Sequence, residues 1–89
     1  MVTVIISHEC SNYADWRVVF DADEPNRLNA GFKSTGVYQA VDNPNKITII
    51  GEAPSVEAIN GFMSNPALKA TMEKGGVIGM PEVKILNKI

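Results

Sequence analysis

The order of strand-like and helix-like segments restricts the fold of this chain more than any other feature. Four segments have the β-branched content or the alternation that is typical of strands: residues 2–8, 32–42, 46–52 and 82–89. Two segments have apolar residues at helical spacing: residues 13–24 and 55–75. The order is therefore strand, helix, strand, strand, helix, strand.

This order matches the split βαβ pattern of the ferredoxin-like fold, in which a four-stranded antiparallel sheet has two helices on one face. At 89 residues the chain is expected to be one α+β domain that spans residues 1–89. A chain this short buries roughly 60 to 65% of the surface of its unfolded form. The core is therefore modest, and self-association would enlarge it.

Capping and turn residues separate the segments. Ser11 or Asn12 is expected to cap the first helix, and Pro25 to break it near residues 22–24. Residues 43–45, Asn-Pro-Asn, are expected to form the turn of a hairpin. Asn65 followed by proline should divide the second helix into two parts.

The first strand is apolar on both faces. Ile6 points the same way as His8, whereas Ile5 points the other way, as Ile50 or its neighbours do in a later strand. Helices on one face leave the second face uncovered, so a second copy is expected to cover it. The sequence predicts a homodimer, and we expect the closed apolar chamber that His8 faces to depend on it.

Composition excludes several classes of partner. The net charge is −2 and the eight basic residues are scattered, which argues against nucleic acid and anionic membrane surfaces as partners. No apolar stretch approaches the ~20 residues of a membrane span, and the N-terminal residues do not resemble a signal peptide. One cysteine excludes an internal disulfide. The expected location is cytoplasmic.

Residues 8–32 contain the only histidine, tryptophan and cysteine, together with a group of Asp, Glu and Arg residues. His8 is a candidate general base because imidazole titrates near neutral pH. The alternative is a histidine satisfied by a neighbouring carboxylate or carbonyl. Arg27 could bind a ligand carboxylate or phenolate, or form a structural ion pair with Asp21, Asp23 or Glu24.

Aromatic residues with helical spacing follow His8. Tyr13, Trp16 and Phe20 could hold a flat aromatic ligand together with Phe62, or could form the buried face of the first helix. The two interpretations are compatible. We therefore expect a cleft between the sheet and the first helix.

Cys10 and the residues around it give weaker signals. A Cys-His nucleophile lacks an evident third member or oxyanion donor, and a metal site lacks a second histidine, although a site bridging two subunits stays open. Gly75-Gly76 ends a helix, so it is not a phosphate-binding loop. No metal and no cofactor are expected.

The sequence resembles the dimeric α+β barrel superfamily, and within it small bacterial antibiotic-biosynthesis-monooxygenase-like proteins. The residues that carry the resemblance are His8, Tyr13, Trp16, Phe20-Asp21, Arg27, Gly31, Val37-Tyr38, Asp42, Pro44-Asn45, Asn65-Pro66, Leu68, Gly75, Val77, Gly79 and Pro81. The superfamily includes cofactor-free oxygenases, haem-degrading enzymes, lactone isomerases, polyketide cyclases and proteins with no known chemistry.

The resemblance implies several residue roles. Cofactor-free quinone-forming members use an Asn, an Arg and a Trp, the residue types of Asn12, Arg27 and Trp16. Cyclase members transfer a proton with a His and a Tyr, which implies His8 with Tyr13 or Tyr38. Haem-degrading members need a histidine late in the chain, which this sequence lacks.

Together these patterns predict an enzyme that acts on a small aromatic or polyketide-like molecule, of the cofactor-independent monooxygenase, cyclase or isomerase type. His8 would move a proton, and Arg27 or Tyr38 would stabilise an oxyanion. The alternative is a non-catalytic ligand-binding or stress-associated dimer in which the same residues are structural.

Overall fold

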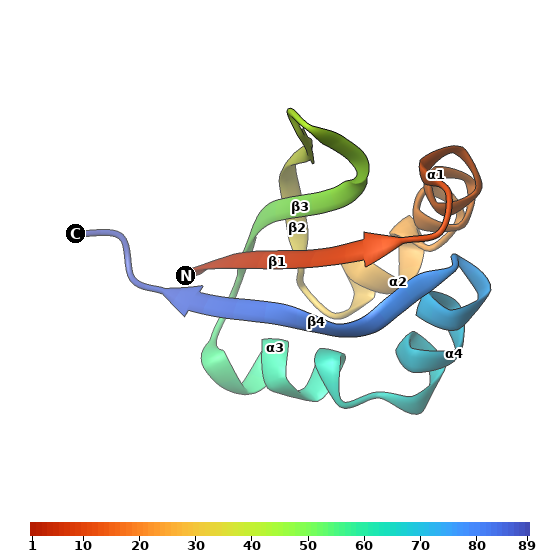
Figure 1. The fold of residues 1–89 in the computed structure, drawn as a ribbon. Helices are drawn as coiled ribbons and strands as arrows, with labels where there is room; N and C mark the ends of the chain where they lie inside the picture. Colours follow the sequence, from red (N-terminus) through yellow and green to blue (C-terminus); the bar gives the residue numbers. More distant parts are fainter.

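The computed structural model describes residues 1–89 and consists of one sheet with helices along one side (Figure 1). The strands are β1 (Val2–Cys10), β2 (Lys33–Ala40), β3 (Asn43–Ala53) and β4 (Val77–Leu86). The helices are α1 (Tyr13–Ala22), α2 (Glu24–Asn29), α3 (Val56–Met63) and α4 (Pro66–Lys74). Neighbouring strands are antiparallel, in the order β2-β3-β1-β4. The predicted ferredoxin-like α+β fold is confirmed.

The core lies between the sheet and the helices. Val4 and Ile6 of β1 are buried, as is Ile49, which pairs with Ile6 from β3. Trp16 from α1 and Ile59 from α3 cover them. Burial of this apolar surface, worth ~25 cal/mol per Å², holds the helices on the sheet.

The expected caps and breaks are observed. Asn12 caps α1, its side-chain oxygen accepting a hydrogen bond from the amide of Asp15 at 3.1 Å. One residue separates α1 from α2, directly before the turn that contains Pro25, and Asn65 caps α4 ahead of Pro66. The helices are short, and none has the combination of length and hydropathy that a membrane-crossing helix needs.

The expected position of the hairpin turn is wrong. Ala40 pairs with Asn43, so only Val41 and Asp42 form the loop and residues 43–45 already belong to β3. The side-chain oxygen of Asn43 accepts a hydrogen bond from the amide of Asn45 at 3.0 Å. This local bond shapes the start of the strand around the proline, so the Asn-Pro-Asn signal marks the strand entry.

The expected limits of the last strand are also wrong. β4 begins at Val77 and ends at Leu86, so Ile89 lies beyond it and is exposed. The pairing of β4 with β1 shifts between Ser7 and Glu9, which places residues 79–81 opposite the single residue His8. Gly79 has φ +70°, and such a bulge on an edge strand accommodates a proline that has no amide to donate.

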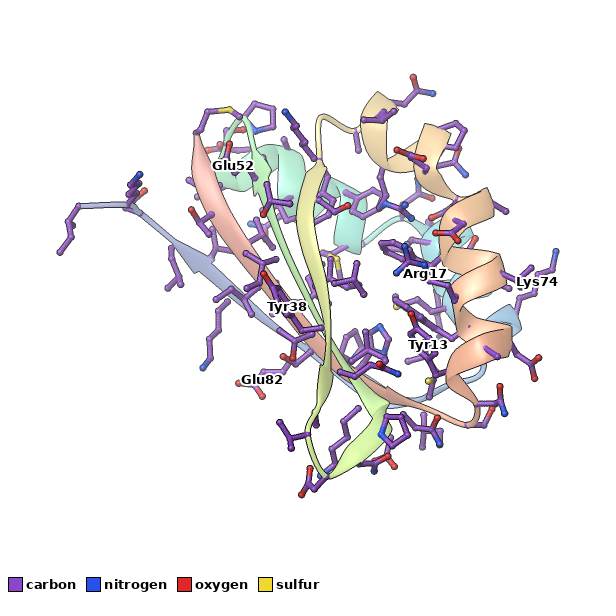
Figure 2. The ribbon with its side chains drawn as sticks, turned by 90° about the horizontal axis from the view of Figure 1, so that it is seen from above. Tyr13, Arg17, Tyr38, Glu52, Lys74 and Glu82 are labelled. Atoms are coloured by element: carbon purple, nitrogen blue, oxygen red, sulfur yellow. The ribbon has the colours of Figure 1, made fainter.

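The face of the sheet away from the helices carries apolar side chains. Ile5 pairs with Ile50 near its centre, and Tyr38 is 56% exposed on β2. Figure 2 shows Tyr38 and Glu82 on this side, whereas Tyr13 and Arg17 lie on the side of the helices. The predicted two-sided apolar character is therefore present.

Candidate functional site

A narrow chamber lies between the sheet and all four helices. Fifteen residues line it, ten of them hydrophobic, and its volume is about 60 Å³. Ligand sites usually have ~300 to 1,000 Å³ and a cavity that holds benzene has ~150 Å³, so the wall of this chamber has to move before an aromatic ring fits. The residues that line it in one chain come from the sheet and from all four helices, and closure of the chamber by a second copy stays a prediction.

Aromatic rings form the wall on the side of α1. Trp16 and Phe20 are stacked with their centroids 4.8 Å apart, and both line the chamber. Tyr13 lies 5.9 Å from Trp16 but does not line the chamber, so it supports that ring from outside. Phe62 lines the opposite side and stacks on Phe32, with 6.1 Å between centroids. The rings are core residues and chamber walls at once.

His8 enters the chamber from β1. Its ring lies 5.4 Å from that of Trp16, and its Nδ1 atom is buried without a hydrogen-bond partner. The carboxylate of Glu9 is on the next residue of the strand and therefore on the opposite face. Burial lowers the pKa of His8 from its ordinary value, so the imidazole is neutral at pH 7. A neutral imidazole whose Nδ1 has no partner in the protein can accept or donate a proton.

Arg27 is the second polar group of the chamber. It is only 7% exposed, and its guanidinium lies 3.7 Å from the centroid of the Phe20 ring. One terminal nitrogen donates a hydrogen bond to the carbonyl oxygen of Phe20 at 2.7 Å. The guanidinium is therefore held by stacking and by one backbone acceptor, which leaves further N–H donors available.

The ion pair that was one of the two alternatives for Arg27 does not form. Asp21 pairs instead with Arg17 at 3.0 Å on the surface of α1. Burial lowers the pKa of Arg27, while the charges of Asp23, Glu24 and Asp21 oppose that shift without contacting the guanidinium. Guanidinium stays protonated in proteins. The chamber therefore contains a cation that has no carboxylate at ion-pair distance.

The structure does not place Tyr38 with these residues. Tyr38 pairs with Thr48 on the helix-free face of the sheet, and its ring lies against Gly36, where an added Cβ atom would be 2.7 Å from the ring. His8 is on the other face. Tyr38 of the same chain therefore cannot contact a ligand in the chamber.

Sequence reasoning missed the residues with which α3 and α4 close the chamber. These are Met63, Leu68, Thr71 and Met72. The helical spacing of apolar residues in residues 55–75 predicts a helix face that packs on the sheet, yet no residue of α4 is buried. Helical spacing of apolar residues does not distinguish a core face from a pocket wall, so the sequence contained no signal for this one. Methionine side chains are flexible, so this wall can adapt to a ligand.

Cys10 is part of the core. It is buried, its thiol lies 3.4 Å from the carbonyl oxygen of Asn45, and burial raises the pKa of the thiol. It is thus protonated and inert at neutral pH. No three His, Cys, Asp or Glu residues lie together in an arrangement that could hold a metal ion.

Solved structures share this architecture. A provisionally named antibiotic biosynthesis monooxygenase from Bordetella bronchiseptica superimposes with a TM-score of 0.81 at 15% identity, over 99% of this chain and 96% of the other. SnoaB, a cofactor-independent oxygenase from Streptomyces nogalater, gives 0.76 at 14% identity, over 99% and 92%. A provisionally named antibiotic biosynthesis monooxygenase from Nitrosomonas europaea gives 0.74 at 7% identity, over 100% and 99%.

The chain has the fold of the antibiotic biosynthesis monooxygenases. The resemblance inferred from sequence is confirmed at this level, because the match extends over nearly the whole of both chains. No family model and no curated protein sequence matches the chain. At these identities the fold alone is shared, so the chemistry has to be argued from the chamber.

Proposed function

We propose that the chain binds a small aromatic molecule in the chamber and that His8 transfers a proton to or from it without a bound cofactor. The main support is the buried Nδ1 atom of His8, which has no hydrogen-bond partner in a chamber lined mostly by hydrophobic residues. The other buried polar group there, Arg27, has no carboxylate partner. Unpaired buried polar groups cost free energy, and groups perturbed in this way cluster at functional sites.

The proposed chemistry follows from the neutral imidazole of His8 and the positive charge of Arg27. Neutral His8 would accept a proton from a phenol or from a carbon next to a carbonyl, which leaves negative charge on a ligand oxygen. Arg27 would bind that oxygen with its free donors, and Trp16, Phe20 and Phe62 would hold the ring. Return of the proton to another carbon gives an isomerase or a cyclase. Reaction of the enolate with molecular oxygen gives an oxygenase, the activity named for SnoaB.

The proposal includes a homodimer formed through the helix-free face of the sheet. Charged residues of both signs surround its apolar centre in equal number: Glu9, Glu52, Glu82, Lys33, Lys46 and Lys84. Because three of these side chains are positive and three are negative, two copies related by a two-fold rotation can bring opposite charges together across the interface. The cytoplasmic location and the absence of nucleic-acid and membrane partners also stay predictions.

A non-catalytic ligand-binding protein is the second candidate. The position of Tyr38 outside the chamber favours this candidate over a cyclase that uses His8 and Tyr38. In that case His8 and Arg27 would recognise the ligand without changing it.

Hydrogen exchange separates the two functions. 2-Tetralone, an aromatic ketone with an acidic C–H group, would be incubated in D₂O and its deuterium uptake followed by proton NMR. We expect the wild-type protein to accelerate exchange over buffer, and His8→Gln to remove the acceleration. The control is Arg17→Gln, because Arg17 lies on the surface of α1 and does not line the chamber.

Binding of the ketone would be measured in parallel through the fluorescence of Trp16, the only tryptophan. If the ketone binds and exchange is no faster than in buffer, the catalytic proposal fails and the ligand-binding function is retained. If exchange is accelerated equally by the His8→Gln protein, the assignment of the base is wrong.

A further inference from the structure

A groove lies next to the chamber, between α2 and the pair of helices α3 and α4. Its volume is about 470 Å³, which is within the usual range for small-molecule sites. Small residues make part of its surface: Ala30, Ala58, Gly61 and Ala67. At Gly61 an added Cβ atom would meet no other atom within 4 Å. The groove is therefore open above α3.

Four residues line both the groove and the chamber: Asp23, Phe62, Leu68 and Thr71. They form a partition one side chain thick. Phe62 and Leu68 are only half-buried, so rotation of these two side chains connects the two spaces. This is the route by which we expect a ring to pass from the groove into the chamber.

The polar groups of the groove are amides and hydroxyls. Asn26 donates a hydrogen bond to the carboxylate of Asp23 at 2.7 Å. The side-chain oxygen of Asn65 accepts from the amide of Ala67 at 2.9 Å, which leaves its NH₂ group free. Asn29 also lines the groove, and no lysine or arginine does. These groups suit hydroxyls, which both donate and accept, and without a basic side chain the groove has no charged partner for an anion.

We propose that the groove and the chamber form one bipartite ligand site. The apolar ring and its anionic substituent enter the chamber, and an uncharged, hydroxyl-rich part such as a sugar occupies the groove. This inference rests on the proposed function for the ring and adds the class of substituent. Phe62 and Leu68 separate the two parts until a ligand binds.

Two ligands that share one ring test the proposal. The first is 2,5-dihydroxybenzoate, and the second is its 5-O-β-glucoside, which carries the same carboxylate and adds only the sugar. Dissociation constants would be measured by isothermal titration calorimetry. We expect the glucoside to bind the wild-type protein about tenfold more tightly, which corresponds to one or two additional hydrogen bonds of ordinary strength.

Gly61→Leu adds an apolar side chain to the groove at a position where the first added atom, Cβ, meets no other atom within 4 Å. We expect it to remove the tenfold advantage of the glucoside and to leave the affinity for 2,5-dihydroxybenzoate unchanged. The matched control is Asn60→Leu, which adds the same side chain to an exposed neighbouring position of α3 outside the groove. Circular dichroism would verify that both variants are folded.

The outcomes separate the two proposals. If 2,5-dihydroxybenzoate binds, and the glucoside binds no better or is insensitive to Gly61→Leu, the bipartite site is wrong while the chamber proposal stands. If the glucoside binds and the free acid does not, with Gly61→Leu abolishing binding, the groove is a site and the chamber proposal fails. If neither ligand binds, both proposals fail for aromatic carboxylates.

Discussion

Replacing His8 by phenylalanine should make the protein more stable while it abolishes proton transfer. Phenylalanine keeps a ring of similar size between Trp16 and the sheet, and it removes the buried Nδ1 atom that has no partner. Leaving such a group unsatisfied costs ~1 to 3 kcal/mol. Because the rest of the imidazole is partly exposed, the low end applies, and the expected gain at pH 7.5 is about 1 kcal/mol.

The gain should increase as the pH falls. Burial lowers the pKa of folded His8 below its unfolded value of 6.5, so the unfolded chain binds a proton that the folded chain does not. Wild-type stability is therefore lost as the pH falls from about 6.5 to the folded pKa, at up to ~1.4 kcal/mol per unit of difference between the two pKa values. Below the folded pKa this loss stops. The His8→Phe protein has no such titration, because the chain contains one histidine.

Urea unfolding followed by Trp16 fluorescence at pH 7.5, 6.0 and 5.0 measures both effects. Carboxylate titrations are common to both proteins and cancel in the difference. His8→Gln is the control, since it does not titrate and keeps a polar group in the chamber. A His8→Phe protein that is less stable than wild type at pH 7.5, or a difference that is flat with pH, would refute the reasoning.

Three further predictions test other residues. Arg27→Met should weaken binding of 2,5-dihydroxybenzoate about 10- to 100-fold, since a charged hydrogen bond contributes ~1.5 to 3 kcal/mol, whereas Arg17→Met should change the calorimetric affinity less than twofold. Tyr38→Lys adds a positive charge to the helix-free face, so the dimer should dissociate in sedimentation velocity; a wild-type monomer, or an unaffected dimer, would contradict the proposed interface. Gly76→Ala, at φ +77°, should lower the free energy of unfolding by at least ~1 kcal/mol in urea, while Gly61→Ala, inside α3, should raise it by ~0.5 to 1 kcal/mol.

The sequence predicts the fold well because the helix caps, the apolar faces of the strands and the order of the segments all indicate the same fold. Asn12 and Asn65 begin helices where their side chains cap them, and Ile5 and Ile6 on opposite faces indicate a strand inside a sheet. The only histidine stands next to the aromatic spacing of α1, and these residues line the chamber together. Local signals and long-range pairing lead to the same arrangement.

The parts that could not be predicted depend on register and distance. Alternation places Tyr38 and Val37 on opposite faces of the sheet but does not say which of them faces the helices. The bulge between Ser34 and Gly36 interrupts the alternation, so the residues before it do not indicate the orientation of those after it. The bulge of β4 opposite His8 has no signal except Gly79. These features are decided by the strand pairing, which no local pattern encodes.

His8, Arg27 and the aromatic rings that line the chamber belong to one polypeptide, so every subunit of an assembly contains the full set of proposed site residues. Each subunit would work as an independent unit, whatever its neighbour contains. A population mixed from intact and His8→Phe chains would lose activity in direct proportion to the damaged share. Subunits that complete each other's sites would instead show a curved dependence on the mixing ratio.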